Sequence, residues 1–285
     1  MSKLAIISRP ITDTSSAFLL LESEDRLLEK SLLNKGEAIS ISIADPSKKF
    51  CVGWYDVTTH TNHVCEGGRE VDAKYDSCFE CRQRTGFNPA FYNTADIPTV
   101  QQDYNSKPHS VYVSYFGDGL AKAGIMSDSR GLERLFEQGA LFYCVVGSFE
   151  NADAAHKVES QLINSGLKNS ITKKQKERVL SKVIDQTSEH GEFSGVLQGL
   201  GLADKAIVSN LDHFFFGSYP SESIKPIGDN PISGTIRGIV GRYLVLENND
   251  RLYGFWLSDL SGYRVDINSN VIEIKAEPEQ VSLFG

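Results

Sequence analysis

The segment from His109 to Glu159 constrains the fold more than any other part of the sequence, because it contains four clear patterns in succession. Two strand-like runs flank a short glycine loop, an amphipathic helical pattern follows, and then come an apolar strand and a second amphipathic helix. Alternating apolar residues are typical of strands, and apolar residues spaced three and four apart are typical of helices. The segment therefore predicts a small mixed unit of strands and helices.

The first two strands are predicted to form a hairpin around the loop Gly117-Asp118-Gly119. A three-residue loop that contains glycine is a favoured hairpin connection. It would pair Tyr112 with Gly124. Tyr112 and Lys122 would then share one face of the hairpin, and Tyr115 would face the other side. A two-residue loop would shift the register and separate Tyr112 from Lys122.

The two predicted helices of this segment carry charged residues at notable positions. Arg130 and Arg134 are four residues apart, so on one helix they would share a face, where two arginines can grip a phosphate. Glu159 falls within or beside the apolar stripe of the second helix. A carboxylate there needs an arginine, a hydrogen-bond network or a metal, because an unpaired buried charge is strongly disfavoured. An ordinary salt bridge to Arg130 or Arg134 and a metal-binding role are both open for Glu159.

Four of the five cysteines fall in the polar segment 51–92, which is too poor in aliphatic side chains to become ordered by burial alone. Cys78 and Cys81 have the Cys-x-x-Cys spacing of a zinc knuckle. Cys51 and Cys65 would complete a closed tetrahedral site. Such a zinc site contributes folding free energy directly.

The zinc prediction has alternatives. Two of the four thiols stand alone in the sequence, so His60 or His63 could replace one of them as a ligand. The Cys-x-x-Cys pair could instead be a redox dithiol, or all four thiols could be plain buried cysteines. The fifth cysteine, Cys144, lies in the apolar run LFYCVV and is predicted to be a small core residue.

The acidic balance of the chain, with 29 Lys and Arg against 37 Asp and Glu, gives a formal net charge of −8. Broad electrostatic capture of nucleic acid needs a basic surface, so this charge argues against it. One local basic cluster could still bind phosphate, or it could be a solvated helix face. It consists of Lys173, Lys174, Lys176, Arg178 and Lys182.

No run approaches the roughly 18 apolar residues needed to span a bilayer, and the N-terminal residues lack a signal-peptide pattern. We therefore expect a cytoplasmic protein that makes no membrane contact.

The rest of the chain is predicted to form sections around this unit. We expect an N-terminal β section (1–50), the four-cysteine zinc-binding segment (51–92), the core (109–190), a helical and loop connection (191–230) and a small C-terminal β-barrel-like domain (231–285). Residues 93–108 have the polar composition of a linker, and SEHGEFSG at 188–195 is expected to break a helix that begins near Ser170.

The C-terminal section is rich in aromatic residues, which in an OB-like barrel can stack nucleic-acid bases or can simply form the domain core. They are Tyr243, Tyr253, Phe255, Trp256 and Tyr263.

The central segment resembles the core of the GIY-YIG nuclease superfamily. Ser110-Val111-Tyr112 resembles the first signature tripeptide, and Lys122-Ala123-Gly124 resembles the second at the usual separation. The helix arginine of that superfamily is matched best by Arg134, and its metal-binding glutamate by Glu159. The fold class that follows is α+β, with a GIY-YIG-like small mixed α/β core between flanking β sections and a zinc-stabilised segment.

The resemblance also implies roles for these residues. Tyr112 would help to activate water, Arg134 would stabilise phosphate charge, and Glu159 would hold one divalent metal such as magnesium. Lys122 stands in place of the second tyrosine, and a lysine is a poor base unless it is desolvated. Arg130 is a rival for the arginine role, because the connection from the second tripeptide to Arg134 is longer than usual.

The whole chain also resembles an uncharacterised bacterial domain family that joins a four-cysteine segment to such a core. The shared runs are GDG at 117–119, K-x-G at 122–124 and RL-x-EQGA at 134–140. We expect a protein that acts on RNA, tRNA or DNA, most concretely a magnesium-dependent phosphodiester hydrolase. The alternatives are an inactive RNA- or tRNA-binding module, and a different enzyme that uses the pocket for a nucleotide or a tRNA-linked substrate.

Overall fold

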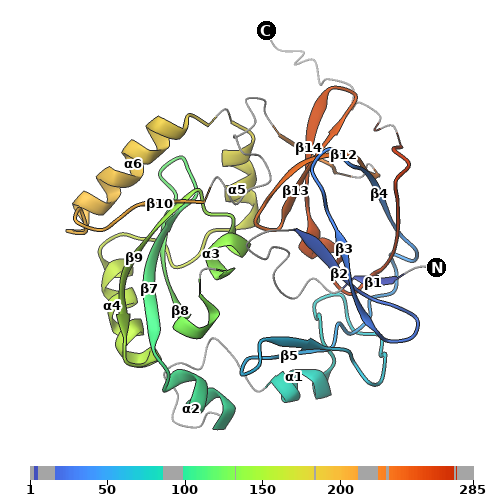
Figure 1. The fold of residues 1–285 in the computed structure, drawn as a ribbon, viewed down its shortest axis with the longest axis horizontal. Helices are drawn as coiled ribbons and strands as arrows, with labels where there is room; N and C mark the ends of the chain where they lie inside the picture. The colour runs from blue at the N-terminus through green and yellow to red at the C-terminus, as the bar shows by residue number, and fades with distance from the viewer. Residues whose placement is uncertain are drawn as a thin grey trace, which may run out of the picture.

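The computed structural model describes residues 3–5, 17–85, 99–131, 133–182, 184–210, 224–228, 231–272 and 274. These residues form a nine-stranded sheet, a four-stranded sheet with helices around it, and a two-stranded sheet in the cysteine segment (Figure 1). The α+β prediction is therefore confirmed.

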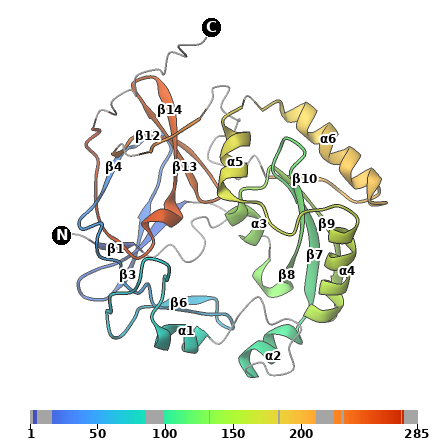
Figure 2. The ribbon, with the colours of Figure 1, turned by 180° about the vertical axis from the view of Figure 1, so that it is seen from behind.

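The four-stranded antiparallel sheet has the strand order β10-β9-β7-β8. Its strands are β7 (His109–Tyr115), β8 (Ala121–Ser127), β9 (Phe142–Phe149) and β10 (Val208–Ser209). Helices α4 (Ala152–Asn164) and α6 (Gln186–Gly199) pack their apolar residues on one side of this sheet. Helices α3 (Glu133–Gln138) and α5 (Lys173–Leu180) lie between it and the nine-stranded sheet (Figures 1 and 2).

The hairpin of β7 and β8 has the predicted register. Tyr112 pairs with Gly124, and the backbone N–H of Phe116 donates to the carbonyl of Leu120 at 2.9 Å. The three loop residues between them all have positive φ, which glycine adopts without strain. Tyr112 consequently packs on the side of α3, while Tyr115 joins the core beneath α6.

The predicted arginine-bearing helix is interrupted, so the prediction that Arg130 and Arg134 share one helix face is wrong. A 3-10 turn, η2 (Asp128–Arg130), ends at Gly131, which has φ 58°, and α3 begins only at Glu133. Glycine allows this break because it has no Cβ to strain in that conformation. The side chain of Arg130 lies outside the part of the chain that the structure describes.

The nine-stranded sheet combines both ends of the chain in the order β11-β14-β13-β12-β4-β15-β1-β2-β3. Its strands are β1 (Lys3–Ala5), β2 (Phe18–Glu22), β3 (Leu28–Leu32), β4 (Ala38–Ile43), β11 (Lys225–Pro226), β12 (Ile232–Val240), β13 (Tyr243–Asn248), β14 (Arg251–Trp256) and β15 (Arg264–Asn268). Strand β4 pairs with both β12 and β15. The N-terminal β section and the C-terminal β domain thus contribute to one sheet, which curls around a shared aliphatic core (Figures 1 and 2).

Most of the C-terminal aromatic residues belong to the protein interior. Tyr243, Tyr253 and Trp256 are buried, and Phe255 packs against the aliphatic core. Apolar rings inside a small β domain contribute a large share of its buried surface. Tyr243, Tyr253 and Phe255 therefore form the core instead of an exposed platform for base stacking, while Trp256 is buried at the edge of a pocket and Tyr263 is partly buried.

Three local predictions differ from the structure. The expected linker contains helix α2 (Thr99–Asn105), whose buried residues are the polar Gln101 and Asn105, so it has no apolar stripe in the sequence. The run at 188–195 does not break a helix but lies inside α6. Its glycines face open space, while Phe193 and Leu197 are buried. The predicted end of the core at residue 190 also falls within α6.

The cysteine segment folds as strands β5 (Trp54–Asp56) and β6 (Thr61–His63) and helix α1 (Phe79–Thr85). Across the described residues, no helix is both long and apolar enough to cross a membrane.

Candidate functional site

A pocket of about 360 Å³ lies between the core and the nine-stranded sheet. Five cationic side chains and a single carboxylate line it, and we call it the cationic pocket. These residues are Lys122, Arg134, Lys173, Lys176, Arg242 and Glu137. A concave site at the junction of two structural units is a common place for a small ligand to bind.

Four separate elements supply the cations of this pocket. Lys122 comes from β8, Arg134 from α3, and Lys173 and Lys176 from α5, which Thr172 starts with a capping box. Arg242 comes from the turn between β12 and β13.

That turn packs directly on the end of α3. A Cβ at Gly241 would lie only 2.6 Å from the backbone nitrogen of Gly139, so only glycine permits the approach. The side chain of the next residue, Arg242, lies 3.7 Å from the carboxylate of Glu137. The close contact of the two backbones therefore brings a charge from the nine-stranded sheet into a site of the core.

Tyr112 lies beside the pocket and is fully buried. Its hydroxyl oxygen accepts hydrogen bonds from Gln138 Nε2 at 2.8 Å and from Arg134 Nε at 3.3 Å. Burial would raise the pKa of this hydroxyl, but the charges of Arg134 and Lys122 and the two donated hydrogen bonds outweigh burial and lower the pKa below its usual range. The cationic neighbours and the two donated hydrogen bonds therefore make this hydroxyl more acidic than an ordinary tyrosine.

Two of the three pocket lysines, Lys122 and Lys176, are partly stripped of water. Burial, together with the nearby charge of Arg134, lowers the pKa of Lys122. Burial followed by repulsion from Lys122 and Arg242 lowers the pKa of Lys176 to about 7. The Lys176 ammonium donates to the carbonyl of Gln138 at 2.5 Å and lies 4.5 Å from the centre of the Phe116 ring.

Glu159 lies close to this group but does not line the pocket. Its side chain is 12 % exposed, and its Oε2 bonds with His156 Nδ1 at 2.9 Å instead of with Arg134. Its charge still attracts Lys122 and partly offsets the fall in the pKa of that lysine. The structure thus brings Tyr112, Lys122 and Arg134 together, with Glu159 at their edge.

The four cysteines form the metal-binding geometry that the sequence predicts. The Sγ atoms of Cys51, Cys65, Cys78 and Cys81 all lie within 4.8 Å of one another. Backbone N–H groups of Gly53 and Cys78 donate to Cys51 Sγ at 3.4 and 3.1 Å. Four converging thiols with N–H donors around them could hold a metal ion and are consistent with a closed structural zinc site.

The histidines near this cluster serve other contacts. His60 Nδ1 lies 3.2 Å from the Tyr55 hydroxyl, and its Nε2 lies 3.4 Å from Ser129 Oγ. His63 stacks on Trp54 with ring centres 4.2 Å apart. Within the described residues, the group that could hold a metal ion therefore consists of the four cysteines, without His60 or His63.

A protein-family model described as "Protein of unknown function (DUF2797)" matches residues 36–265, a range that includes the cysteine segment, the core and most of the nine-stranded sheet. The chain belongs to the DUF2797 family. The expected resemblance to an uncharacterised domain family is confirmed to that extent. No curated protein and no solved structure matches the chain.

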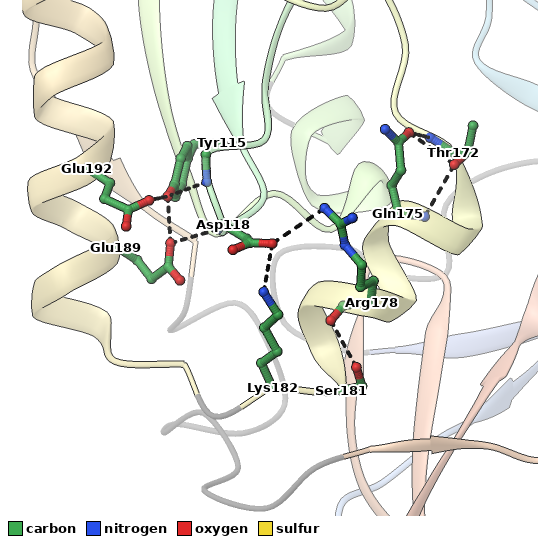
Figure 3. Close-up of polar contacts among 10 residues, drawn as sticks. Tyr115, Asp118, Thr172, Gln175, Arg178, Ser181, Lys182, Glu189 and Glu192 are labelled. Carbon is green, nitrogen blue, oxygen red and sulfur yellow. Dashed lines mark hydrogen bonds and ion pairs between the residues drawn. The ribbon is translucent and has the colours of Figure 1, made fainter. Parts of the chain in front are cut away.

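The basic cluster predicted from the sequence is divided in this DUF2797 chain. Lys173 and Lys176 line the cationic pocket, and Lys174 is exposed beside them. Lys182 and Arg178 turn toward the hairpin loop, where they approach Asp118 Oδ2 at 2.9 and 3.5 Å (Figure 3). The five residues therefore do not form one solvated face.

The same loop is held from the other side by α6. The Tyr115 hydroxyl lies 2.6 Å from Glu189 Oε2 and 2.8 Å from Glu192 Oε2, and the backbone N–H of Asp118 donates to Glu189 at 3.0 Å (Figure 3). Burial, then the bond to Glu189, raises the pKa of Tyr115. These contacts fix the hairpin tip next to α5, and hence next to the pocket lysines.

Sequence reasoning missed two important parts of the site in this DUF2797 chain. Gln138 follows Arg134 by four residues, and this spacing could have identified it as a neighbour on the same helix face. No sequence pattern around Arg242 indicates that it belongs to the site, because only the pairing of distant strands brings it to the core.

Proposed function

We propose that this chain acts on nucleic acid by binding a phosphate group in the cationic pocket and hydrolysing a phosphodiester bond with the aid of magnesium. The observation that carries the proposal is the meeting of Tyr112, Lys122 and Arg134 at a pocket lined by five cations and one carboxylate. A phosphate oxyanion is the common biological anion that such a set of donors suits.

The chemistry of each residue follows from its surroundings. Arg134 and Lys122 would stabilise the charge that grows on the phosphate oxygens during attack. Tyr112 in its deprotonated form, which its cationic neighbours favour, would accept a proton of the attacking water as the phosphorus–oxygen bond to the leaving group breaks, and the leaving oxygen would take a proton from solvent. Glu159 has one oxygen on His156 and a second oxygen with which to bind a divalent ion, and magnesium is commonly held by one carboxylate together with substrate phosphate. Magnesium bound there would neutralise phosphate charge.

Purified protein with magnesium is expected to nick structured RNA, tRNA or branched DNA. Glu159→Gln should abolish nicking while leaving the unfolding temperature close to that of the parent, because the amide keeps the side-chain shape. Glu150→Gln is a matched control, since Glu150 is exposed just before α4 and lies outside the site. Absence of nicking by the parent protein on all three substrates would rule out the reaction.

One observation favours a second candidate, a module that binds nucleic acid without cutting it. Tyr112 has no exposed surface, so water cannot reach its hydroxyl unless Arg134 or Gln138 moves. The cations of the pocket would still bind phosphate. Salt-dependent binding of RNA or tRNA, with no product formed in magnesium, would identify this function.

A further inference from the structure

The cationic pocket carries more positive charge than one phosphodiester requires. Five cationic side chains line it against the single carboxylate of Glu137. Glu137 lies next to Arg242, and Asp259 pairs with Lys173 at the exposed side. Considering only described residues, neither Lys122 nor Lys176 takes part in an ion pair.

The charge of the ligand should match this excess. An internal phosphodiester carries one negative charge, whereas a phosphomonoester carries about −1.5 to −2 near pH 7 and has three terminal oxygens to accept hydrogen bonds. Lys122, Arg134 and a Lys176 amine that gains its full positive charge when an anion lies beside it are therefore better balanced by the monoester.

The size of the pocket points the same way. Its volume of about 360 Å³ lies at the lower end of the range for small-ligand sites, roughly 300 to 1,000 Å³. The ring of Trp256 forms part of the wall and is fixed by a hydrogen bond from its Nε1 to Glu177 Oε1 at 2.5 Å. A phosphate with one attached nucleoside is of suitable size, and the indole offers it an apolar surface.

We propose that the cationic pocket binds a terminal phosphate, the phosphomonoester of a nucleic-acid strand end or of a free nucleotide, in preference to an internal phosphodiester. This inference rests on the proposed function, because both place the phosphate between Lys122, Arg134 and Lys176. Lys176 is the residue that selects the doubly charged phosphomonoester. Its amine lies deep in the pocket and its hydrogen-bond acceptor, the Gln138 carbonyl, is neutral, so the positive charge is left to be balanced by the ligand.

The test compares two single-stranded oligonucleotides that carry a 3′ fluorophore and differ only in having a 5′-phosphate or a 5′-hydroxyl. Binding is followed by fluorescence anisotropy near pH 7 without magnesium, so that no cutting occurs, and without a chelator, so that the cysteine site is undisturbed. The phosphorylated strand should bind about tenfold more tightly, the effect of one additional charge-assisted hydrogen bond. A pair of strands with a 3′-phosphate or 3′-hydroxyl and a 5′ fluorophore tests the other end.

Lys176→Met should remove most of this preference, because methionine keeps the apolar stem but not the charge. Lys174→Met is the matched control, since Lys174 lies on the same helix, is exposed and does not line the pocket. Arg242→Gln gives a second test from a different element, should the lysine variant fold poorly. Loss of preference in Lys176→Met and Arg242→Gln, with the control unchanged, supports the inference.

The outcomes separate this inference from the proposed function. Equal affinity for both ends, combined with a steep dependence on salt, would overturn the terminal-phosphate inference while leaving phosphate binding intact. Failure of any strand to bind would overturn both. Competition by adenosine monophosphate but not by adenosine would support recognition of the terminal phosphate; adenosine monophosphate binding at least as tightly as the phosphorylated strand would identify a free nucleotide as the ligand, and much weaker binding would identify the strand end. Equal competition by adenosine would overturn a role for the phosphate.

Discussion

Gly124 shows how one missing side chain shapes the candidate site. A Cβ at this position would lie 2.4 Å from the Tyr112 hydroxyl oxygen and 2.5 Å from Cζ of the same ring. Tyr112 can therefore lie across its hairpin partner only because residue 124 is glycine. The ring is in turn held by Gln138 and Arg134, so the glycine acts on the geometry of the pocket through the tyrosine.

Gly124→Ala is expected to lower the free energy of unfolding by about 1 to 3 kcal/mol, the usual cost of overpacking a core. Gly147→Ala is the matched control, because Gly147 lies in β9 of the same sheet and its added Cβ would meet nothing closer than 3.6 Å. Denaturant unfolding of the two variants measures the difference. Equal stability of both variants would contradict the placement of the Tyr112 ring over residue 124.

Lys176 should give the folded protein a measurable pH dependence. The folded pKa of about 7 lies below the ordinary value of 10.5, so between these values the unfolded chain binds more protons and stability rises with pH. The free-energy cost of burying the charged Lys176 side chain is fully present below pH 7 and falls as pH rises. The charged groups that face this pocket are Lys122, Arg134, Glu137, Lys173 and Arg242.

Lys176→Met removes that penalty, so its stability advantage over the parent is expected to shrink as pH rises from 7 to 9, by at most about 1.4 kcal/mol per pH unit. Chemical unfolding at a series of pH values measures this, with Lys174→Met as the control that should follow the parent. An advantage that grows with pH would show that Lys176 is not desolvated in the folded state.

At the scale of elements, the four cysteines hold together β5, β6 and α1, which share few aliphatic contacts. Their local core consists of the cysteines themselves with Trp54 and Val71 packed against them. We expect a zinc ion bound by these thiols to order the segment, because metal binding and folding are one equilibrium in small sites of this kind.

Removal of zinc should therefore unfold this segment selectively. Hydrogen exchange with and without a strong chelator is expected to show loss of protection across residues 51–85, while β7, β8 and α4 remain protected. Cys78→Ser should lower the zinc content measured by atomic absorption. Cys144→Ala should not, because Cys144 is buried in the core sheet away from the cluster. Unchanged protection after metal removal would mean that the thiols are plain core residues.

Elements whose geometry is fixed by nearby residues were predictable from the sequence. The hairpin register followed from the length of the loop at 117–119, and α4 followed from the spacing of Ala152, Ala155 and Leu162. Helix α6 was missed because Gly191 and Gly195 resemble breakers, although both occupy its open side. The signal that could have identified α6 is Asp185, whose side chain caps its first turn.

At the scale of the whole molecule, the site depends on contacts that no local pattern contains. Tyr112, Lys122 and Arg134 lie within one predicted unit, so their meeting could be anticipated. Arg242 and Trp256 reach the same pocket only because the nine-stranded sheet docks its β12–β13 turn against α3. Hydrophobic periodicity predicts which face of an element is buried, but not which distant element will cover it.

The interleaving of terminal strands in the nine-stranded sheet sets an order of events during synthesis. Strands β1, β2 and β3 can pair with one another early, but β4 has no neighbours until β12 and β15 have left the ribosome. The cationic pocket acquires Arg242, Trp256 and Ser258 in the same late step. A nascent chain that already contains a folded core therefore lacks one wall of the cationic pocket until Arg242, Trp256 and Ser258 have been translated.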